Sequence, residues 1–438
     1  MDPPLSNRRG RRECRNRRII CAKSYCIYSM IELIPLSTSV NTTVSIPGSK
    51  SVTNRALILG ALTPKDVTIQ NPLMCDDTEA MIACLRALGI SIEKKADSFV
   101  VHGNYTDVKD REYHLNANLS GTTIRFITAF CCIVPGIKTL SGKERLNERP
   151  IKGLVDALRQ LGATIKYVGK EGFPPINISS SRLDNKVIEM DGGVSSQFVT
   201  AIMLLSPVIG DVKITFSTSP ISKSYSDLTK HMVKEWGAQG LDTYHVEGDY
   251  SAAGYFAAIA ALTNSTILLK NLETNSKQGD RLFLDILTKM GTEVEYKDEE
   301  VVVRGHGVKP IEVDMEQCPD QAQTLALLAA FAKRTSILTG VRSLRVKETE
   351  RVKALQSELL KMNIQTESPD EDTLIIHGGN PKPATIDTYN DHRMAMSFAV
   401  AGAKLNGMKI NNPEVVKKTF PAFWEKLREI GISVVYLT

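Results

Sequence analysis

Residues 49–62 read SKSVTNRALILGAL. This stretch opens with polar and charged side chains and continues as a run of alanine, leucine and isoleucine. A helix that is apolar on all sides is buried in a protein core or a membrane, and this run is shorter than the roughly 20 residues that a membrane span needs. The pattern therefore predicts a helix inside a protein core, with its polar N-terminus at the edge.

The same pattern recurs five more times along the chain. The other copies are SGTTIRFITAF (120–130), GVSSQFVTAIMLL (193–205), DYSAAGYFAAIAAL (249–262), PDQAQTLALLAAFA (319–332) and NDHRMAMSFAVAGA (390–403). Free N–H groups at a helix N-terminus form a natural anion site. Six such N-termini brought together would form a strong anion trap.

An amphipathic helix follows each of these segments and ends before a β-like run. A glycine or asparagine stands at each end, where a left-handed residue can close a helix: Gly89, Gly162, Gly237, Gly291, Asn363 and Gly431. The steps between these ends are 73, 75, 54, 72 and 68 residues. The repetition predicts six α/β units, grouped three to a domain, with a seam near residue 247 at the short step.

The composition indicates a folded protein with more than one core. Of 438 residues, 42% are hydrophobic and 24% charged, which excludes global disorder and a long coiled coil. The eight cysteines include no CxxC pair and the seven histidines show no metal-ligand spacing. We therefore expect reduced thiols, a cytoplasmic location, no metal and no membrane span.

The positive charge is concentrated at the N-terminus. Residues 1–29 hold eight basic and two acidic side chains, a net charge of +6, so the remaining 409 residues sum to −1. A nearly neutral body argues against binding of nucleic acid or acidic membranes by the folded part. We expect residues 1–29 to be a disordered extension or to result from a mis-assigned start, and we leave them out of the fold.

Charged and hydroxyl side chains cluster at the openings of the buried helices, although each opening alone is equally consistent with a capped helix and solvated charges. PGSKSVTNR (47–55) places an ammonium, a hydroxyl and a guanidinium within about one turn. LRVKETERV (344–352) and TYNDHRMAM (388–396) bring further cations and carboxylates to the edge of a core. Because such openings precede nearly every buried helix, the joint pattern favours a binding site for anions.

Seven of these motifs, taken in order, resemble the 5-enolpyruvylshikimate-3-phosphate synthases, and the resemblance covers residues of about 30 to 438. They are PGSKSVTNRAL, SGTTIR, ERPI, VSSQF, RVKETER, TYNDHRMAM and KKTFP. The resemblance implies the enolpyruvyl transferase fold, an α/β (α+β) inverse α/β barrel with two domains of three βαβαββ repeats joined by a double crossover. We expect one domain over 30–47 and 247–438, and the other over 48–246.

The resemblance also implies the reaction, EC 2.5.1.19, in the shikimate pathway toward chorismate and aromatic amino acids. The enolpyruvyl group of phosphoenolpyruvate moves to the 5-hydroxyl of shikimate 3-phosphate by addition and elimination, with release of phosphate. The expected partners are these two small molecules, with no cofactor, no nucleic acid and a monomeric chain. At least one acid/base pair and a cluster of cations are needed for two such anions.

The resemblance assigns residues to both substrates. Those expected to bind shikimate 3-phosphate are Lys50, Ser51, Arg55, Ser195, Ser196, Gln197, Ser222, Tyr225, Asp320, Ser343 and Lys347. Those expected around phosphoenolpyruvate are Lys50, Gly121, Arg149, Gln197, Arg351, Arg393 and Lys418. We expect Asp320 to accept the proton of the 5-hydroxyl, and Glu348, with Lys50 and His392 as neighbours, to handle the proton at the methylene carbon.

Three positions depart from the family pattern. Leu119 stands where many relatives have asparagine and Phe126 where the best-known relatives have proline, and these two departures bear on herbicide sensitivity. Ser343 stands where asparagine is frequent near the phosphate of shikimate 3-phosphate, so we expect one contact there to be lost or replaced by water. The alternatives are the sister transferase that acts on UDP-N-acetylglucosamine, a polyanion-binding protein on a fold like that of RNA 3′-phosphate cyclases, and an inactive homologue. The sister enzymes usually carry a loop cysteine and a Lys-Asn opening, where this chain has Lys50-Ser51.

Overall fold

The computed structural model describes residues 29–179, 182–193, 195–219 and 221–437. The extension predicted over residues 1–29 therefore lies outside the described residues, apart from Ser29. No helix in these ranges is both long and apolar enough to cross a membrane.

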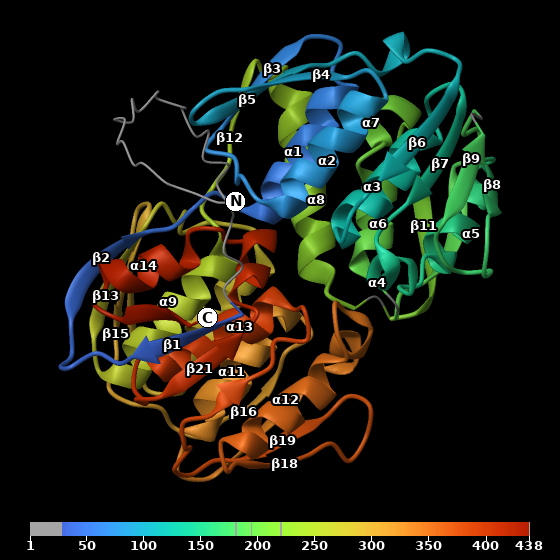
Figure 1. The fold of residues 1–438 in the computed structure, drawn as a ribbon. Coiled ribbons are helices and arrows are strands. Elements are labelled where there is room, and N and C mark those ends of the chain that lie inside the picture. The colour runs from blue at the N-terminus through green and yellow to red at the C-terminus, as the bar shows by residue number, and fades with distance from the viewer. Residues whose placement is uncertain (1–28, 180–181, 194, 220, 438) are drawn as a thin grey trace, which may run out of the picture.

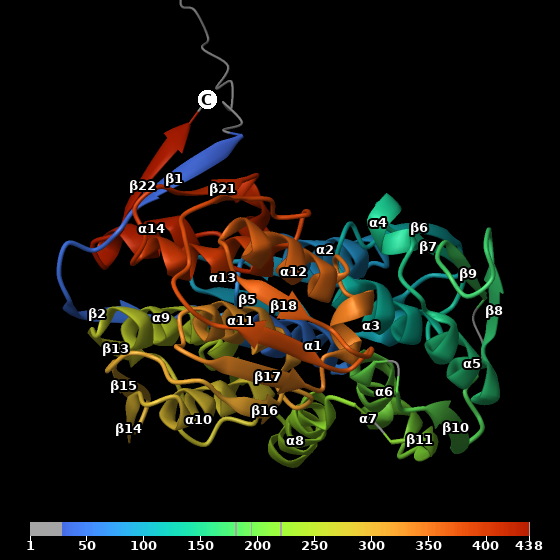
Figure 2. The ribbon, with the colours of Figure 1, turned by 90° about the horizontal axis from the view of Figure 1, so that it is seen from below.

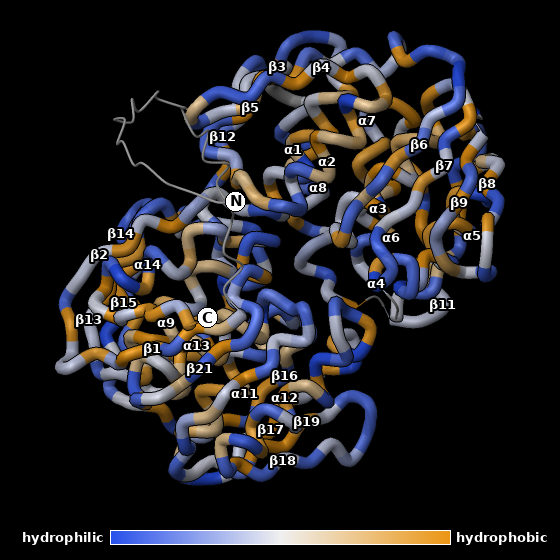
Figure 3. The backbone as a smooth tube through the Cα atoms, viewed as in Figure 1, coloured by the Kyte–Doolittle hydropathy of each residue, from blue (hydrophilic) through white to orange (hydrophobic). Residues whose placement is uncertain are grey.

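All six predicted buried helices are present. They are α1 (Lys50–Leu62), α3 (Gly121–Cys131), α6 (Ser196–Met203), α9 (Tyr250–Thr263), α11 (Ala322–Ala330) and α13 (His392–Gly402). Every residue of α3 and α13 is buried, as their apolar composition requires. Figure 3 shows these hydrophobic helices inside the molecule and hydrophilic loops around them.

The amphipathic helices lie outside the buried ones. They are α2 (Asp76–Ala87), α5 (Lys152–Gln160), α8 (Lys223–Gln239), α10 (Leu282–Lys289), α12 (Arg351–Lys361) and α14 (Phe423–Glu429). Five of the six predicted closing residues have positive φ just past the helix end, for example Gly89 at 102° and Asn363 at 62°. The prediction for Gly237 was wrong, because this residue lies inside α8 and Gly240 takes φ 51° instead. Burial of Met232 and Trp236 holds the last turns of α8 in place despite the glycine.

The strands form five four-stranded sheets of one recurring order. In the sheet β6-β7-β9-β8 the first two strands are parallel and the remaining pairs antiparallel. Its strands are β6 (Glu112–Asn116), β7 (Ile137–Ser141), β8 (Thr164–Tyr167) and β9 (Ile176–Ser179). The same order recurs in β16 (Glu312–Asp314), β17 (Thr335–Thr339), β19 (Leu374–His377) and β18 (Gln365–Glu367). This order is that of the βαβαββ unit that the resemblance implies.

Three sheets are completed by a strand from a distant part of the chain. β12 (Thr243–His245) joins β3 (Asp66–Gln70), β5 (Ser98–His102) and β4 (Ser91–Lys94). β2 (Asn41–Ser45) joins β13 (Thr266–Lys270), β15 (Glu300–Arg304) and β14 (Glu293–Lys297). β1 (Met30–Ile34) lies between β21 (Met408–Asn411) and β22 (Ser433–Leu437), beside β20 (Thr385–Ile386). Figure 2 shows β22, β1 and β21 together at one edge of the molecule.

One unit, the third along the chain, is shorter than predicted. Its sheet has only β10 (Val187–Asp191) and β11 (Lys213–Thr218), because the chain leaves α8 through β12 into another sheet. The expectation of six complete βαβαββ units was therefore wrong for this copy, and the missing hairpin accounts for the short step of the sequence. The α/β class with buried helices is confirmed, and the six sheets of the described residues are separate and open, with no closed barrel among them.

Buried hydrophobic side chains form two separate clusters. The first cluster contains residues between 31 and 46 and between 250 and 434, and the second contains residues between 52 and 246. In Figure 1 the blue strands β1 and β2 lie with the yellow-to-red elements of the first cluster, whereas α1 and α3 lie with the second.

Two glycines mark where the chain passes between the clusters. Gly48 and Gly248 form an isolated antiparallel bridge, and the Ser49 N–H donates to the Glu247 carbonyl at 2.8 Å. A Cβ on Gly48 would meet the Asn71 carbonyl oxygen at 2.0 Å, and one on Gly248 would meet the Asn271 carbonyl oxygen at 1.7 Å. Only glycine fits where the two crossing segments lie against these loops.

Candidate functional site

One pocket at the N-termini of the buried helices brings together all eleven residues expected to bind shikimate 3-phosphate. Lys50, Ser51 and Arg55 of α1 face Asp320, Ser343 and Lys347 from the first-cluster side. Arg149 and Gln197, which we expected around phosphoenolpyruvate, also line the pocket. The lining residues that the sequence analysis did not assign are Thr122, Arg125, Pro150, Phe198, Ile221 and Val346.

Two guanidinium groups in this pocket are buried without a carboxylate partner among the described residues. Arg55 donates to the Thr229 hydroxyl at 2.8 Å and to the Ser51 carbonyl at 2.8 Å, and burial lowers its pKa to about 10. Arg125 donates to the Gly121 carbonyl at 2.9 Å, and burial, aided by the neighbouring Arg149, lowers its pKa well below the usual range. Both guanidinium groups are therefore set to receive an external anion.

Asp320 lies in a cluster of cations beside this pocket. Its carboxylate pairs with Arg393 at 2.7 Å, Arg351 at 3.2 Å and Lys347 at 3.5 Å. Burial alone would raise the pKa of Asp320, but the neighbouring cations, led by Arg393, hold this pKa well below the usual range. Asp320 is therefore ionised at neutral pH and can accept a proton.

Arg351, at the start of α12, is the most buried cation of the cluster. It is 1% exposed and its Nε donates to Asp391 at 2.7 Å, while Nη2 donates to Asp391 at 3.3 Å and to Glu348 at 3.0 Å. Asp391 caps α13 by accepting from the Arg393 N–H at 2.9 Å. Asp391 belongs to the TYNDHRMAM motif, but the sequence analysis gave it no role of its own. Its carboxylate holds both Arg351 and the start of α13, where Arg393 lies.

Glu348 connects the two sides of the site. Its carboxylate pairs with Lys418 at 2.8 Å and with Arg149 at 3.5 Å. Burial would raise its pKa, but the surrounding cations, led by Lys418, hold the pKa of Glu348 well below the usual range. Lys418 also donates to the Leu119 carbonyl at 3.1 Å. Leu119 departs from the family pattern, but this hydrogen bond does not depend on its side chain, because the main-chain carbonyl accepts it.

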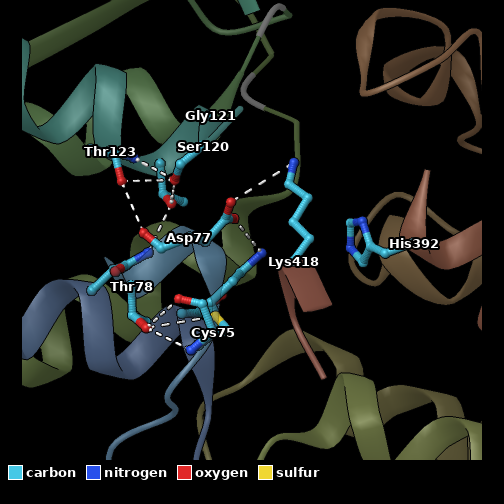
Figure 4. Close-up of polar contacts among 12 residues, drawn as sticks. Cys75, Asp77, Thr78, Ser120, Gly121, Thr123, His392 and Lys418 are labelled. Carbon is cyan, nitrogen blue, oxygen red and sulfur yellow. Dashed lines mark hydrogen bonds and ion pairs between the residues drawn. The ribbon is translucent and has the colours of Figure 1, made fainter. Parts of the chain in front are cut away.

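His392 is buried at the start of α13, and neither ring nitrogen has a hydrogen-bond partner among the described residues. Burial, together with the positive charges of Lys418 and Arg393, holds the pKa of His392 well below its usual range. Figure 4 shows the imidazole beside Lys418. His392 is therefore a neutral ring whose Nδ1 lies 3.5 Å from Asp391 Oδ1 and whose Nε2 has no hydrogen-bond partner among the described residues.

Asp77 is a site residue that the sequence analysis missed. It lies in the first turn of α2, is 3% exposed, and pairs with Lys50 at 3.5 Å and with Lys418 at 3.9 Å. Figure 4 shows Asp77 between Lys418 and the loop at Ser120. Burial would lower the pKa of Lys50, but carboxylates led by Asp77 outweigh it and raise this pKa. Lys50 therefore stays protonated.

Gly121 begins α3 beneath two guanidinium groups. A Cβ at this position would lie 2.7 Å from Nη1 of Arg125 and 2.7 Å from Nη1 of Arg149. Any side chain would therefore displace the cations that the glycine admits.

The resemblance implies that Arg149 binds phosphoenolpyruvate, and on that expectation Gly121→Ala should raise KM for phosphoenolpyruvate by about tenfold or more, because small misplacements of binding groups cost up to about 10²-fold. Steady-state kinetics at saturating shikimate 3-phosphate measures this change. Gly169→Ala is the control, since nothing lies within 4 Å of a Cβ there. An unchanged KM in Gly121→Ala would contradict the expectation that displacement of Arg125 and Arg149 weakens binding of this substrate.

The remaining predicted residues lie around the same site. Lys50 and Arg393 line a second, smaller pocket with Ser251 and Tyr255. Arg351 and Lys418 do not line the larger pocket, and they reach the site through Asp320 and Glu348. The structure therefore brings all the predicted site residues to one region between the two clusters.

Helices buried within open sheets, with a cationic site at their N-termini, agree with what the resemblance implies, the class of enolpyruvyl transferases. A family model described as EPSP synthase (3-phosphoshikimate 1-carboxyvinyltransferase) matches residues 35–427. The chain belongs to this family. The predicted family, fold class and enzyme class, a transferase of the shikimate pathway, are thereby confirmed.

Individual relatives agree over nearly their whole length. The 3-phosphoshikimate 1-carboxyvinyltransferase of Sulfurovum sp. (strain NBC37-1) is 38% identical over 410 residues, covering 89% of this chain and 96% of the relative. That of Vibrio vulnificus (strain YJ016) is 38% identical over 420 residues, covering 90% and 97%.

Two solved structures are similar to this fold. EPSP synthase from Acinetobacter baumannii has a TM-score of 0.75 at 25% identity, covering 92% of this chain and 99% of that one. The enolpyruvyl transferase NikO from Streptomyces tendae has a TM-score of 0.72 at 17% identity, covering 94% and 99%, and this likeness concerns the fold alone.

Proposed function

We propose that this chain transfers the enolpyruvyl group of phosphoenolpyruvate to the 5-hydroxyl of shikimate 3-phosphate at the site between the two clusters. The observation that carries this proposal is the pair of buried guanidinium groups, Arg55 and Arg125, with no carboxylate partner among the described residues. A buried unpaired cation is costly, and an anionic substrate removes that cost.

The pocket supplies what shikimate 3-phosphate requires. The pocket lining includes the hydroxyls of Ser195, Ser196 and Ser222. It also includes two positive charges, those of Lys347 and Arg55. Hydroxyls and cations together suit a phosphate and a ring that carries hydroxyls. We assign the other predicted residues of this group, Ser51, Gln197, Tyr225 and Ser343, to the same substrate.

The neighbouring cations suit phosphoenolpyruvate. Arg351 and Arg393 both pair with Asp320, and Lys418 and Arg149 both pair with Glu348. A substrate anion competes with these two carboxylates for the four cations. Their positive charge therefore becomes available when phosphoenolpyruvate arrives. Exclusion of water from the closed site strengthens these contacts.

The addition step needs a base and an acid. Asp320 accepts the proton of the 5-hydroxyl as that oxygen bonds to C2 of phosphoenolpyruvate, and the electron pair of the double bond takes a proton at the methylene carbon. Lys50 is the protonated group of the three and supplies that proton in the addition, whereas the ionised Glu348 and the neutral His392 can take a proton from the methyl group in the elimination. Substrate anions that draw cations away from Asp320 raise its basicity at the moment it acts.

In the elimination step the proton that Asp320 took goes to the leaving phosphate, because the 5-oxygen is now an ether oxygen, and a basic group takes a proton from the new methyl group. The new methyl group loses a proton, the double bond re-forms, and the C–O bond to phosphate breaks so that phosphate leaves with the electron pair. The cations around Glu348 and Asp320 stabilise the leaving dianion.

The reaction in D2O tests this proposal. If a methyl intermediate forms, mass spectrometry should find deuterium in the vinyl group of the product, because a solvent-derived deuteron joins two hydrogens and any of the three can leave. The same substrates without protein provide the control. Product that contains no vinyl deuterium would contradict the addition and elimination mechanism.

Asp77→Asn tests the state of Lys50. Removal of this carboxylate lowers the raised pKa of Lys50, so the loss of kcat/KM with rising pH should begin at lower pH than in the wild type. Asp76→Asn, an exposed neighbour on the same helix, is the matched control. Identical pH profiles for Asp77→Asn and the wild type would remove Lys50 from the proton transfers.

We propose two domains, residues 30–47 with 247–438 and residues 48–246, that close on shikimate 3-phosphate. The two hydrophobic clusters and the glycine pair at the crossover support this division. Contacts such as Arg145 Nε to the Glu348 carbonyl at 2.9 Å link the two sides.

Solution X-ray scattering measures the proposed closure. The radius of gyration should fall on addition of shikimate 3-phosphate, because closure brings the two domains together and completes the second site. An unchanged radius of gyration at saturating substrate would contradict closure.

We further propose that the enzyme is monomeric and cytoplasmic and that it does not bind nucleic acid.

A further inference from the structure

The short helix η2 (Gly279–Arg281) carries a buried carboxyl group that the mechanism does not use. Asp280 is 4% exposed, and no cation contacts its oxygens among the described residues. One oxygen accepts a hydrogen bond from the Ser251 hydroxyl, and the other accepts from the Tyr225 hydroxyl at 3.5 Å. Burial, with the nearby Asp320, raises the pKa of Asp280 to about 6.

The two hydroxyls belong to opposite sides of the site. Tyr225 lies in α8, which packs in the second cluster, and lines the larger pocket. Ser251 lies in α9 of the first cluster and accepts from Nη2 of Arg393 at 3.4 Å. A chain of hydrogen bonds therefore runs from Tyr225 through Asp280 and Ser251 to Arg393.

Close packing makes this chain depend on how the two sides meet. A Cβ on Gly279 would lie 2.3 Å from the Ser224 hydroxyl oxygen and 2.4 Å from the Gln317 carbonyl oxygen. Ser224 also donates its hydroxyl to the Gln317 carbonyl at 2.7 Å. The start of α8 thus packs directly against η2. Tyr225 reaches Asp280 only when the start of α8 is packed in this way.

We propose that Asp280 is a positioning residue that couples the two substrate sites. This inference rests on the proposed function. Shikimate 3-phosphate that engages Tyr225 holds the start of α8 on η2, and Asp280 then fixes Ser251 and the guanidinium of Arg393 for phosphoenolpyruvate. The second substrate consequently binds better after the first, and the coupling is reciprocal.

Asp280→Asn tests this coupling in the full chain. The variant is expected to raise KM for phosphoenolpyruvate, measured at saturating shikimate 3-phosphate, by about fivefold or more, with a smaller change in kcat. Ser251→Ala breaks the same chain on the other side of Asp280 and should have a similar effect. Asp285→Asn, an exposed carboxyl on α10, is the matched control.

The combination with Tyr225→Phe separates coupling from a merely structural role. Tyr225→Phe should raise KM for phosphoenolpyruvate in the wild-type background and add nothing in the Asp280→Asn background. If the wild type is active, either of two results would overturn the inference. One is that the effects of Tyr225→Phe and Asp280→Asn on KM multiply in the double variant, and the other is an unchanged KM in both Asp280→Asn and Ser251→Ala. A wild type without turnover would overturn the proposed function, and the inference with it.

Discussion

Asp320→Asn is expected to lower kcat by about 10²–10⁴-fold, the usual contribution of a positioned acid or base. The amide keeps the shape of the side chain but cannot take the proton of the attacking hydroxyl. Binding should survive, because the pocket retains Arg55, Arg125 and the serine hydroxyls. Steady-state kinetics with both substrates measures kcat and the two KM values separately.

A matched control isolates the role of this carboxylate. Asp314→Asn makes the same chemical change at an exposed position six residues earlier and should leave kcat within about twofold. A kcat in Asp320→Asn within about threefold of the wild type would assign the base to another group, because general-base loss is far larger than that.

Arg351→Ala is expected to lower the free energy of unfolding by about 3–5 kcal/mol, the cost of removing one partner from a buried ion pair. Asp391 is 0% exposed and receives two hydrogen bonds from this guanidinium, so alanine leaves a buried carboxylate without its cation. Urea denaturation followed by circular dichroism measures the loss. KM for phosphoenolpyruvate should rise as well, since the same guanidinium faces Asp320 and Glu348.

A second variant shows whether the orphaned carboxylate causes this loss. Arg351→Ala combined with Asp391→Asn should recover part of the stability, because the amide removes the unpaired buried charge. A stability within about 1 kcal/mol of the wild type in Arg351→Ala, a value typical of exposed pairs, would contradict the account of this ion pair. Equal losses in the single and double variants would place its origin in packing.

Much of the fold could be predicted because the six buried helices are short, apolar and separated by regular steps. The pairing of β2 and β12 with strands of distant units could not be predicted, because nothing in the residues of β2 or β12 identifies the partner strand. The local pattern at Gly237 was also insufficient, since a glycine can lie inside a helix when neighbouring side chains such as Trp236 are buried.

The site followed from its polar openings, which stand out against apolar helices. Asp77 could not be identified as a site residue from the sequence, because acidic residues in the first turn of a helix are ordinary partners of the helix dipole. Only the folded chain shows that Asp77 faces Lys50 and Lys418, 27 residues before and 341 residues beyond it. Asp280 was missed for the same reason, since both of its hydroxyl partners are distant in sequence.

Release of phosphate by the purified chain is the decisive measurement for enolpyruvyl transfer. We expect release that requires phosphoenolpyruvate and shikimate 3-phosphate together, that does not occur when UDP-N-acetylglucosamine replaces the second substrate, and that collapses in Asp320→Asn. A folded wild-type protein that releases no phosphate with both substrates, or releases it with the nucleotide sugar instead, would contradict the account.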